Sequence, residues 1–534
     1  MPTSRRRPLA ALALTILTAM SVSSCSQVAG TASTAAPVVI TSAPPPTDVT
    51  PPATVTSSPA PGITVPPTFD AAPRPGPDAG GDPGTIGSSG IGDPYYPDDG
   101  NGGYQVDGYD LNLQYLPDSN ALTSTATITG SVTSPAGLSR FNLDLQPNLT
   151  VSSVSVNDAP ATFDRQDAEL VITPGTVLPA GSPLLVTVSY AGSPDVVGGG
   201  TGVGGDGGWF RTASGGAFAA GEPTGASTWY PVNEHPADTA TFAVTATVPQ
   251  GWEVISNGIQ RTDGLPAPPS GMSTFRWELN VPVASYLSTI YIDRFTRIDG
   301  TLADGTPVVS AIAPDAGPDA AELARQTGPV IDVLTELFGP YPMPAAGGIF
   351  TGNRTGFALE TATRPVYSIG TDNLDTVVHE LAHQWYGDDV TIKQWSDICL
   401  NECFASYASW LYAEKVSGAD LDRHWKQRLQ SVLSVPEYWS SPLVDMGPGN
   451  EFTRVYDKGP LALHALRKEI GDDAFFAIIK DWPATYGGQN AGWDDFEAFV
   501  NQATGQDHTA FMDAWFRGTT VPPAQDLYPG DLGN

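Results

Sequence analysis

The stretch Asp375-Thr-Val-Val-His-Glu-Leu-Ala-His-Gln-Trp-Tyr-Gly387 is the segment around which the rest of the chain is organised. Apolar residues recur in it at helical spacing, Asp372 or Asp375 can cap its start, and Gly387 suits the position after its end. The pattern predicts one short helix. His379 and His383 lie four residues apart on it, so both imidazoles project from one face and can reach a single metal ion.

Glu380 lies beside the two histidines without being forced to bind the metal. This HExxH arrangement is typical of zinc peptidases, in which the imidazoles hold the metal and the carboxylate takes a proton from water. The alternative is a helix with two hydrogen-bonded histidines and a solvated glutamate. A third ligand decides between them, because a catalytic zinc site uses three protein ligands and keeps one position open.

The third ligand is not another histidine at metzincin spacing, because Asp389 occupies that position. Asp388 and Asp389 could bind a metal in principle, but both follow the helix-ending glycine. Glu402 is the better candidate, since it lies in a second helical pattern over residues 397–414. Packing of this second helix on the first would bring Glu402 to the metal held by His383.

HELAHQW followed by LNECFASY resembles the M1 family of zinc aminopeptidases, whose helix pair reads HExxHxW and then NEGF. Three further segments match in family order. Residues 356–361 lie where the family carries GAMEN, Tyr456-Asp-Lys-Gly459 matches YxKG, and residues 221–236 resemble a first-domain segment that helps to recognise the substrate amine. Within residues 356–361, however, Phe357, Leu359 and Thr361 replace the usual Gly, Met and Asn, which leaves the side-chain preference open.

The resemblance implies a hydrolase that removes N-terminal residues from peptides, with one zinc ion per chain. The implied metal ligands are His379, His383 and Glu402. Glu380 is then the general base, and Tyr456 donates its hydroxyl to the oxygen on which negative charge develops.

Glu360 and Glu222 are the residues that the resemblance assigns to the substrate's free ammonium group. Carboxylates suit this task because a desolvated cation left unpaired is costly. The alternatives are a thermolysin-like endopeptidase, a surface-anchored binding protein with a vestigial zinc site and, more remotely, an epoxide hydrolase as in one M1 branch. Full-length M1 enzymes commonly continue into a helical domain that caps the cleft; this chain stops at Asn534, so we expect a more open cleft.

The net charge of −32 argues against binding a nucleic-acid backbone and agrees with an exported, soluble surface. Residues 1–24 combine a basic head, a short apolar run and small residues, which predicts an export signal. The end of this segment resembles a bacterial lipobox, with Cys25 as the lipidated residue. We therefore expect an enzyme anchored by lipid to the outer face of a bacterial plasma membrane, with a cleaved signal and a secreted protein as the alternative.

Composition and periodicity divide the remainder into three parts. Residues 25–103 are rich in Pro, Thr, Ala and Gly, which predicts a disordered stalk. From 104 to 299 the apolar period is two, which predicts an antiparallel β-sandwich. Residues 300–534 carry several helical patterns, which predict a mainly helical domain: among them are 320–338, 421–432, 459–470 and 493–502. The resemblance to the M1 family implies that this is a thermolysin-like catalytic domain. The predicted fold class is therefore multidomain α+β.

Cys399 and Cys403 lie four residues apart on the helix that carries Glu402. We expect two small, half-buried free thiols, because an i,i+4 pair on a helix gives a strained bridge. Thiolate ligands are the alternative, but they would compete with a site that already has three ligands.

Overall fold

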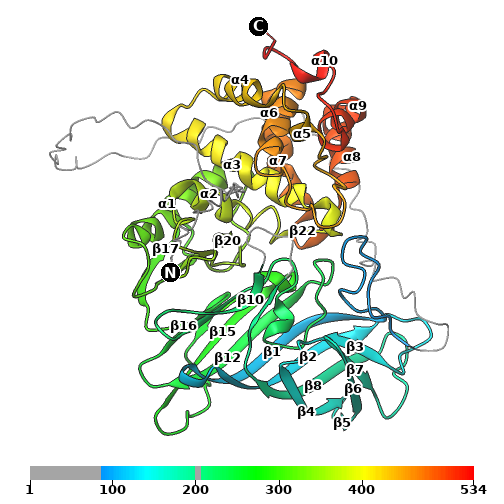
Figure 1. Ribbon diagram of the computed structural model, residues 1–534, viewed down its shortest axis with the longest axis vertical. Coiled ribbons are helices and arrows are strands. Elements are labelled where there is room, and N and C mark those ends of the chain that lie inside the picture. The colour runs from blue at the N-terminus through cyan, green and yellow to red at the C-terminus, as the bar shows by residue number, and fades with distance from the viewer. Residues whose placement is uncertain (1–85, 199–205, 534) are drawn as a thin grey trace, which may run out of the picture.

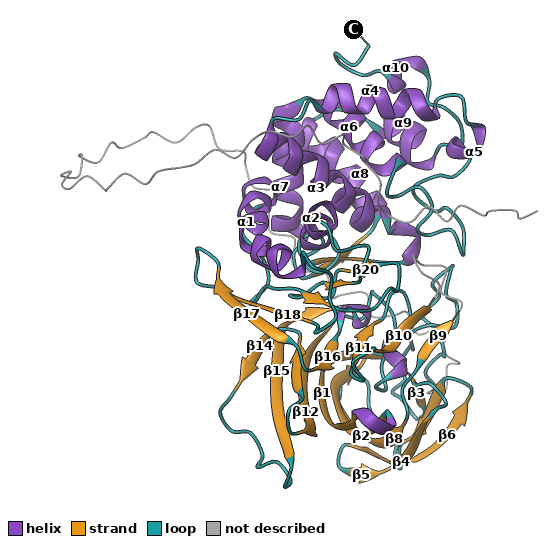
Figure 2. Ribbon diagram, turned by 60° about the vertical axis from the view of Figure 1, so that its left-hand side comes forward, coloured by secondary structure: helices purple, strands orange, loops and turns teal. Residues whose placement is uncertain are grey.

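The computed structural model describes residues 86–198 and 206–533. Within them, a strand-rich part precedes a mainly helical part, as Figures 1 and 2 show. This arrangement confirms the predicted α+β architecture. The predicted export signal, Cys25 and most of the predicted stalk lie outside the described residues.

The first domain is built on an eight-stranded sheet with the order β14-β15-β12-β1-β2-β8-β4-β5. Tyr109, Leu111 and Leu113 are buried on one face of β1 (Tyr104–Leu116), as the period of two predicts. β1 pairs antiparallel with β2 but parallel with β12, so the sheet is mixed rather than wholly antiparallel. The remaining strands of this sheet are β2 (Ala121–Val132), β4 (Leu149–Val156), β5 (Ala159–Pro160), β8 (Pro183–Gly192), β12 (Ala240–Pro249), β14 (Ile259–Arg261) and β15 (Met272–Val283).

Two smaller sheets complete the sandwich, with orders β13-β16-β11-β10-β9 and β3-β7-β6. Trp209 of β10 packs edge-on against Tyr115 of β1, with ring centroids 5.1 Å apart, which joins the five-stranded sheet to the eight-stranded one. Their strands are β3 (Phe141–Asp144), β6 (Thr162–Gln166), β7 (Glu169–Thr173), β9 (Val196–Gly198), β10 (Asp206–Arg211), β11 (Ala217–Ala220), β13 (Glu253–Ser256) and β16 (Ile290–Asp293).

The second domain begins with its own sheet, in the order β17-β18-β19-β21-β20. Because β17 (Thr296–Thr301) pairs along its length with β18 (Pro307–Ile312), the domain boundary lies before residue 296 rather than at the predicted residue 299. The short strands β19 (Ile349–Phe350), β20 (Ala358–Leu359) and β21 (Val366–Tyr367) complete the sheet, and β22 (Val390–Ile392) pairs with β23 (Gln489–Ala491).

The helices of the second domain follow the apolar periodicity of the sequence. The helices predicted over 320–338 and 421–432 are observed with these bounds, and the other predicted helices differ by a few residues at their ends. In the described part of the chain, none of the helices is long and apolar enough to cross a membrane. The helices are α1 (Ala320–Phe338), α2 (Leu374–Ala382), α3 (Cys399–Ser417), α4 (Leu421–Val432), α5 (Pro436–Trp439), α6 (Lys458–Ile470), α7 (Asp472–Tyr486), α8 (Trp493–Thr504), α9 (Thr509–Met512) and α10 (Ala524–Leu527).

Residues 86–103 contradict the predicted stalk boundary, because they pack onto both domains. The buried Asp93 carboxylate accepts hydrogen bonds from the Trp395 backbone N–H of the second domain and contacts His235 Nε2 of the first, each at 3.0 Å. The Tyr95 hydroxyl donates to Asp445 at 3.0 Å. Polar contacts of a few side chains thus hold this Gly- and Pro-rich segment in place. Such contacts cannot be predicted from composition alone.

Cys399 and Cys403 form a disulfide, so the expectation of free thiols is wrong. The pair lies in the first turn of α3, where the Cα atoms are 4.8 Å apart. This separation falls within the range that a disulfide spans. Neither cysteine is therefore available as a metal ligand.

The two domains are joined directly at the segment after β20. The guanidinium of Arg364, which is fully buried, donates to the backbone carbonyls of Ser256 and Gly258 in the first domain at 2.8 and 2.7 Å. Asn257 Nδ2 donates to the Ala362 carbonyl at 2.7 Å. These bonds fix the sandwich against the segment that carries Glu360.

Candidate active site

The helix α2 presents His379 and His383 toward one point. Asn373 caps its start by accepting a hydrogen bond from the Thr376 N–H at 3.0 Å, so neither Asp372 nor Asp375 is the cap. The buried Val378 and Leu381 hold the helix against the core. The Nε2 atoms of the two histidines are 3.1 Å apart.

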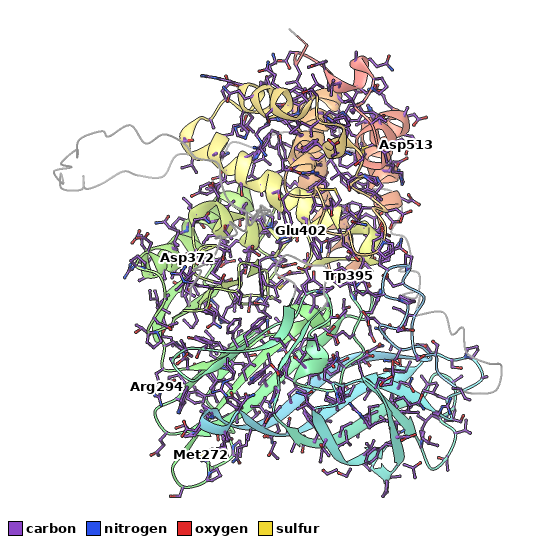
Figure 3. All side chains as sticks on the ribbon, viewed as in Figure 1. Met272, Arg294, Asp372, Trp395, Glu402 and Asp513 are labelled. Atoms are coloured by element: carbon purple, nitrogen blue, oxygen red, sulfur yellow. A yellow bond between two sulfur atoms is a disulfide. The ribbon has the colours of Figure 1, made fainter. Side chains whose placement is uncertain are left out.

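Glu402 on α3 meets both histidines. Its Oε2 lies 3.0 Å from His379 Nε2 and 3.5 Å from His383 Nε2. Figure 3 places Glu402 on its helix, with Trp395 nearby toward the strand-rich domain. These distances confirm the predicted position of Glu402, on a second helix and close to both histidines.

The hydrogen bonds around His383 fix its tautomer. His383 Nδ1 lies 3.0 Å from the Tyr386 carbonyl oxygen, which can only accept, so Nδ1 carries the proton. Nε2, which lies on the side of Glu402 and His379, is therefore the nitrogen that can bind a metal once it carries no proton. An outer contact of this kind is the usual means of orienting a histidine that binds a metal.

The donor set fits one divalent cation. One ligand atom each of His379, His383 and Glu402 lies within 4.8 Å of the other two. Burial alone would raise the pKa of Glu402, but the neighbouring histidines outweigh it and lower this pKa to about 2. Two imidazole nitrogens and an ionised carboxylate are ligands that zinc prefers, and three of them leave a coordination position open.

Glu380 lies beside this trio and is not part of it. One of its carboxylate oxygens lies within 4.8 Å of ligand atoms of Glu360 and His383, and its side chain is almost wholly buried. Burial, and then the charges of Glu360 and Glu402, raise the pKa of Glu380 well above its ordinary value, although His383 opposes the shift. A buried carboxylate with a raised pKa has a strong affinity for a proton.

Tyr456 approaches from the segment before α6. Its hydroxyl donates to Glu402 Oε1 at 3.2 Å, and its ring centroid lies 5.9 Å from that of His379. Two residues later, the buried Lys458 ammonium donates to the Ser441 and Gly518 carbonyls at 2.8 and 3.1 Å. The tyrosine thus faces the ligands, whereas the lysine of the same motif holds the segment in place.

Glu360 and Glu222 lie on the side of the site that faces the sandwich. Glu360 follows β20 and is 2% exposed. Glu222 follows β11, and its buried Oε1 has no hydrogen-bond partner among the described residues. Burial, and then the charge of Glu360, raise the pKa of Glu222, so the two carboxylates are near enough to interact. An unpartnered acceptor of this kind is suited to a cationic ligand.

Sequence reasoning named these seven side chains, and the structure brings all of them to one region. Asp388 and Asp389, which it kept as possible ligands, do not join the metal-binding trio. It missed Tyr286, whose hydroxyl donates to Glu360 Oε1 at 3.3 Å. No motif marks Tyr286, since its only sequence signal is its place just after a strand.

Comparisons with known proteins find similarity to M1 peptidases. The family described as "Peptidase family M1 domain" matches residues 347–515. Human glutamyl aminopeptidase is 29% identical over 335 residues, covering 56% of this chain and 34% of the relative. Human aminopeptidase N is 25% identical over 327 residues, covering 54% and 34%. The chain thus spans about a third of the length of these relatives.

Solved structures resemble a larger share of the chain. The M1 zinc metallopeptidase from Deinococcus radiodurans is 29% identical, with a TM-score of 0.74 that covers 81% of this chain and 98% of the other. A variant of that enzyme was solved with a bound Tyr-Ser-Ala substrate, and it aligns with a TM-score of 0.73.

Proposed function

This chain belongs to the M1 peptidase family, and from that premise we propose that it is a zinc aminopeptidase, which removes N-terminal residues from peptides. One observation carries the proposal. The metal-binding trio of His379, His383 and Glu402 lies next to a carboxylate outside the trio, that of Glu380, and to two further carboxylates, those of Glu360 and Glu222. A site that only bound a metal would need neither.

His379, His383 and Glu402 would hold the zinc ion. When bound, zinc supplies Lewis acidity, which makes water a nucleophile near neutral pH and polarises a carbonyl group. The tautomer of His383, set by Tyr386, keeps a lone pair directed at the metal position.

Glu380 acts as the general base. Its carboxylate is buried beside His383 and outside the ligand set, so it can accept the proton of the attacking water and later pass it to the leaving amine. The low-dielectric surroundings that raise its pKa also favour this transfer.

Tyr456 donates a hydrogen bond to the oxygen on which negative charge develops. Its hydroxyl is already directed at the ligand cluster through Glu402 Oε1. If the hydroxyl turned away from the Glu402 carboxylate, it could donate to a substrate carbonyl bound beside the ligand cluster. A hydrogen-bond donor that reaches developing negative charge in a buried site stabilises that charge strongly.

Glu360 and Glu222 bind the free ammonium group of the substrate. Both belong to the carboxylate group beside the metal position, and their mutual repulsion is relieved when a cation lies between them. This requirement for an ammonium group restricts cleavage to the first peptide bond.

The test is a comparison of aminoacyl fluorogenic substrates with their N-acetylated counterparts, with and without a zinc chelator. We expect hydrolysis of the free-amine substrates alone, lost with chelator and restored by zinc. Equal cleavage of acetylated peptides would point to an endopeptidase. A zinc-replete protein with no turnover on any peptide would contradict the enzymatic proposal.

We further propose that the protein is exported and anchored to the cell envelope through a lipid on Cys25. The basic head, apolar run and lipobox-like end of residues 1–25 support this. Replacing Cys25 with Ala should move the full chain from the membrane fraction to the soluble fraction, and an unchanged distribution would contradict the anchor.

A further inference from the structure

Tyr286 belongs to the first domain, yet its hydroxyl lies at the candidate active site. It lies in the short 3₁₀ helix η3 (Ser285–Leu287), just after β15, and is 1% exposed. Its ring packs against Trp395, with centroids 5.5 Å apart. The side chain is therefore held on its apolar faces, and only the hydroxyl has a polar role.

The hydroxyl stands between two residues of the catalytic domain. Asn401 Nδ2 donates to the Tyr286 oxygen at 3.4 Å, and the hydroxyl donates to Glu360 Oε1 at 3.3 Å. The tyrosine oxygen accepts from the Asn401 amide, so its single proton is directed to Glu360. Asn401 directly precedes the metal ligand Glu402 on α3, so the three groups link the metal-bearing helix to Glu360.

The backbone fixes the distance between Tyr286 and Glu360. The Ala362 N–H donates to the Leu287 carbonyl at 3.0 Å, one residue beyond Tyr286 and two beyond Glu360. On the other side, Gln384 Nε2 donates to the Glu360 carbonyl at 3.3 Å. The backbone around Glu360 is therefore held on both sides. In the described part of the chain, the Tyr286 hydroxyl donates to the Glu360 carboxylate.

We propose that Tyr286 is a positioning residue for ammonium recognition, holding Oε1 of Glu360 so that Oε2 is presented to the substrate's N-terminus. This role rests on the proposed aminopeptidase function. A carboxylate held by a charge-assisted hydrogen bond loses less side-chain freedom when a ligand binds. Hydrogen bonds in ligand-free active sites commonly shorten in the complex, and bonds of 3.3–3.4 Å leave room for this.

The experiment compares Tyr286→Phe with Tyr104→Phe. Tyr104 is a matched control, because it is fully buried in the same domain and its hydroxyl donates to the Asn142 carbonyl at 2.6 Å, away from the site. For a free-amine substrate, we expect Tyr286→Phe to raise KM about 10-fold or more, with kcat changed by less than about 3-fold, since the lost contact acts on binding. Tyr104→Phe should leave both constants near the parent values.

A double-mutant cycle separates positioning from general loosening of the fold. In a Glu360→Ala background, Tyr286→Phe should have no further effect on KM, because its target is gone. An unchanged KM in folded, zinc-replete Tyr286→Phe would overturn the assignment, and so would a full additional effect in the Glu360→Ala background. Failure of the proposed function is recognised separately, as a parent enzyme without zinc-dependent hydrolysis of free-amine substrates.

Discussion

Two metal-binding side chains, His383 and Glu402, each have a further partner that sets their direction. The Tyr386 carbonyl fixes the His383 tautomer, and the Tyr456 hydroxyl bonds to Glu402 Oε1, whereas the histidines contact Oε2. A ligand set held in this way needs little reorganisation when a metal binds.

Glu380→Gln tests the assignment of Glu380 as the general base. The amide keeps the size of the side chain but cannot accept the proton, so kcat/KM should fall by about 10²- to 10⁴-fold while zinc remains bound. Peptide kinetics and metal analysis of the same sample check both parts. Substantial hydrolysis by a zinc-replete variant would contradict the assignment. Glu402→Gln serves as the contrast, since it should lose zinc and activity together.

The shared face of His379 and His383 could be predicted from sequence, because helical spacing determines which side chains lie together. Glu402 lies on a second helix, so its approach could be expected only with the help of the M1-like motif. Tyr286 could not, because its role depends on the contact between two domains rather than on a local pattern. The free thiols predicted for Cys399 and Cys403 were wrong for a geometric reason. The prediction rested on the strain expected for an i,i+4 pair on a helix, whereas the two Cα atoms are 4.8 Å apart, within the range that a disulfide spans.

The Cys399–Cys403 disulfide constrains the start of α3, which carries Glu402. A Cβ on Gly459, at the start of α6, would lie 2.6 Å from Cys403 Sγ, so the bridge also packs tightly against the segment that follows Tyr456. Replacing both cysteines with Ser should lower the free energy of unfolding by about 2 kcal/mol, because the bridge closes a short loop. Chemical unfolding of the parent and the double variant checks this. Equal stabilities would contradict it.

A further prediction concerns His464, which lies on helix α6. His464 Nδ1 lies 2.8 Å from the Tyr407 hydroxyl and Nε2 lies 3.0 Å from Asp422 Oδ1, so a neutral ring satisfies both partners. Burial lowers the pKa of His464 to about 4, although Asp422 opposes the shift. The unfolded chain, with an ordinary histidine pKa of about 6.5, therefore binds a proton between these pH values where the folded chain does not.

Stability should consequently fall as the pH falls from about 6.5 to about 4, by at most about 3 kcal/mol from this residue. Urea unfolding across this range should show a steeper decline for the parent than for His464→Gln, which cannot titrate. The variant should also be less stable at pH 7, because it loses the paired contacts. Identical slopes in the two proteins would show that His464 does not cause the decline.

Direct hydrogen bonds hold the two domains together around the site. Helices predicted from apolar periodicity lie where expected, for example α1 and α4. The connection between the domains was not predictable, because the buried Arg364 and the segment 86–103 act through contacts with residues far away in sequence. A Gly- and Pro-rich composition predicts disorder, and it does not reveal a single buried anchor such as Asp93.

Asp93→Ala tests whether residues 86–103 hold the domains together. The change would leave the Trp395 N–H and His235 Nε2 without their buried acceptor, at a cost of about 1–3 kcal/mol for each group. Thermal unfolding of the full chain should therefore shift to lower temperature. Ser88→Ala is a milder control, since its hydroxyl bonds only within the same segment. Equal unfolding temperatures for parent and Asp93→Ala would show that the segment does not stabilise the assembly.

The metal content of the purified full chain is the most direct measurement of the central claim. Elemental mass spectrometry should find one zinc ion per chain in the parent protein and little in Glu402→Ala, because three converging ligands are required for tight binding. A folded parent protein that contains no zinc and takes up none when zinc is added would contradict the account.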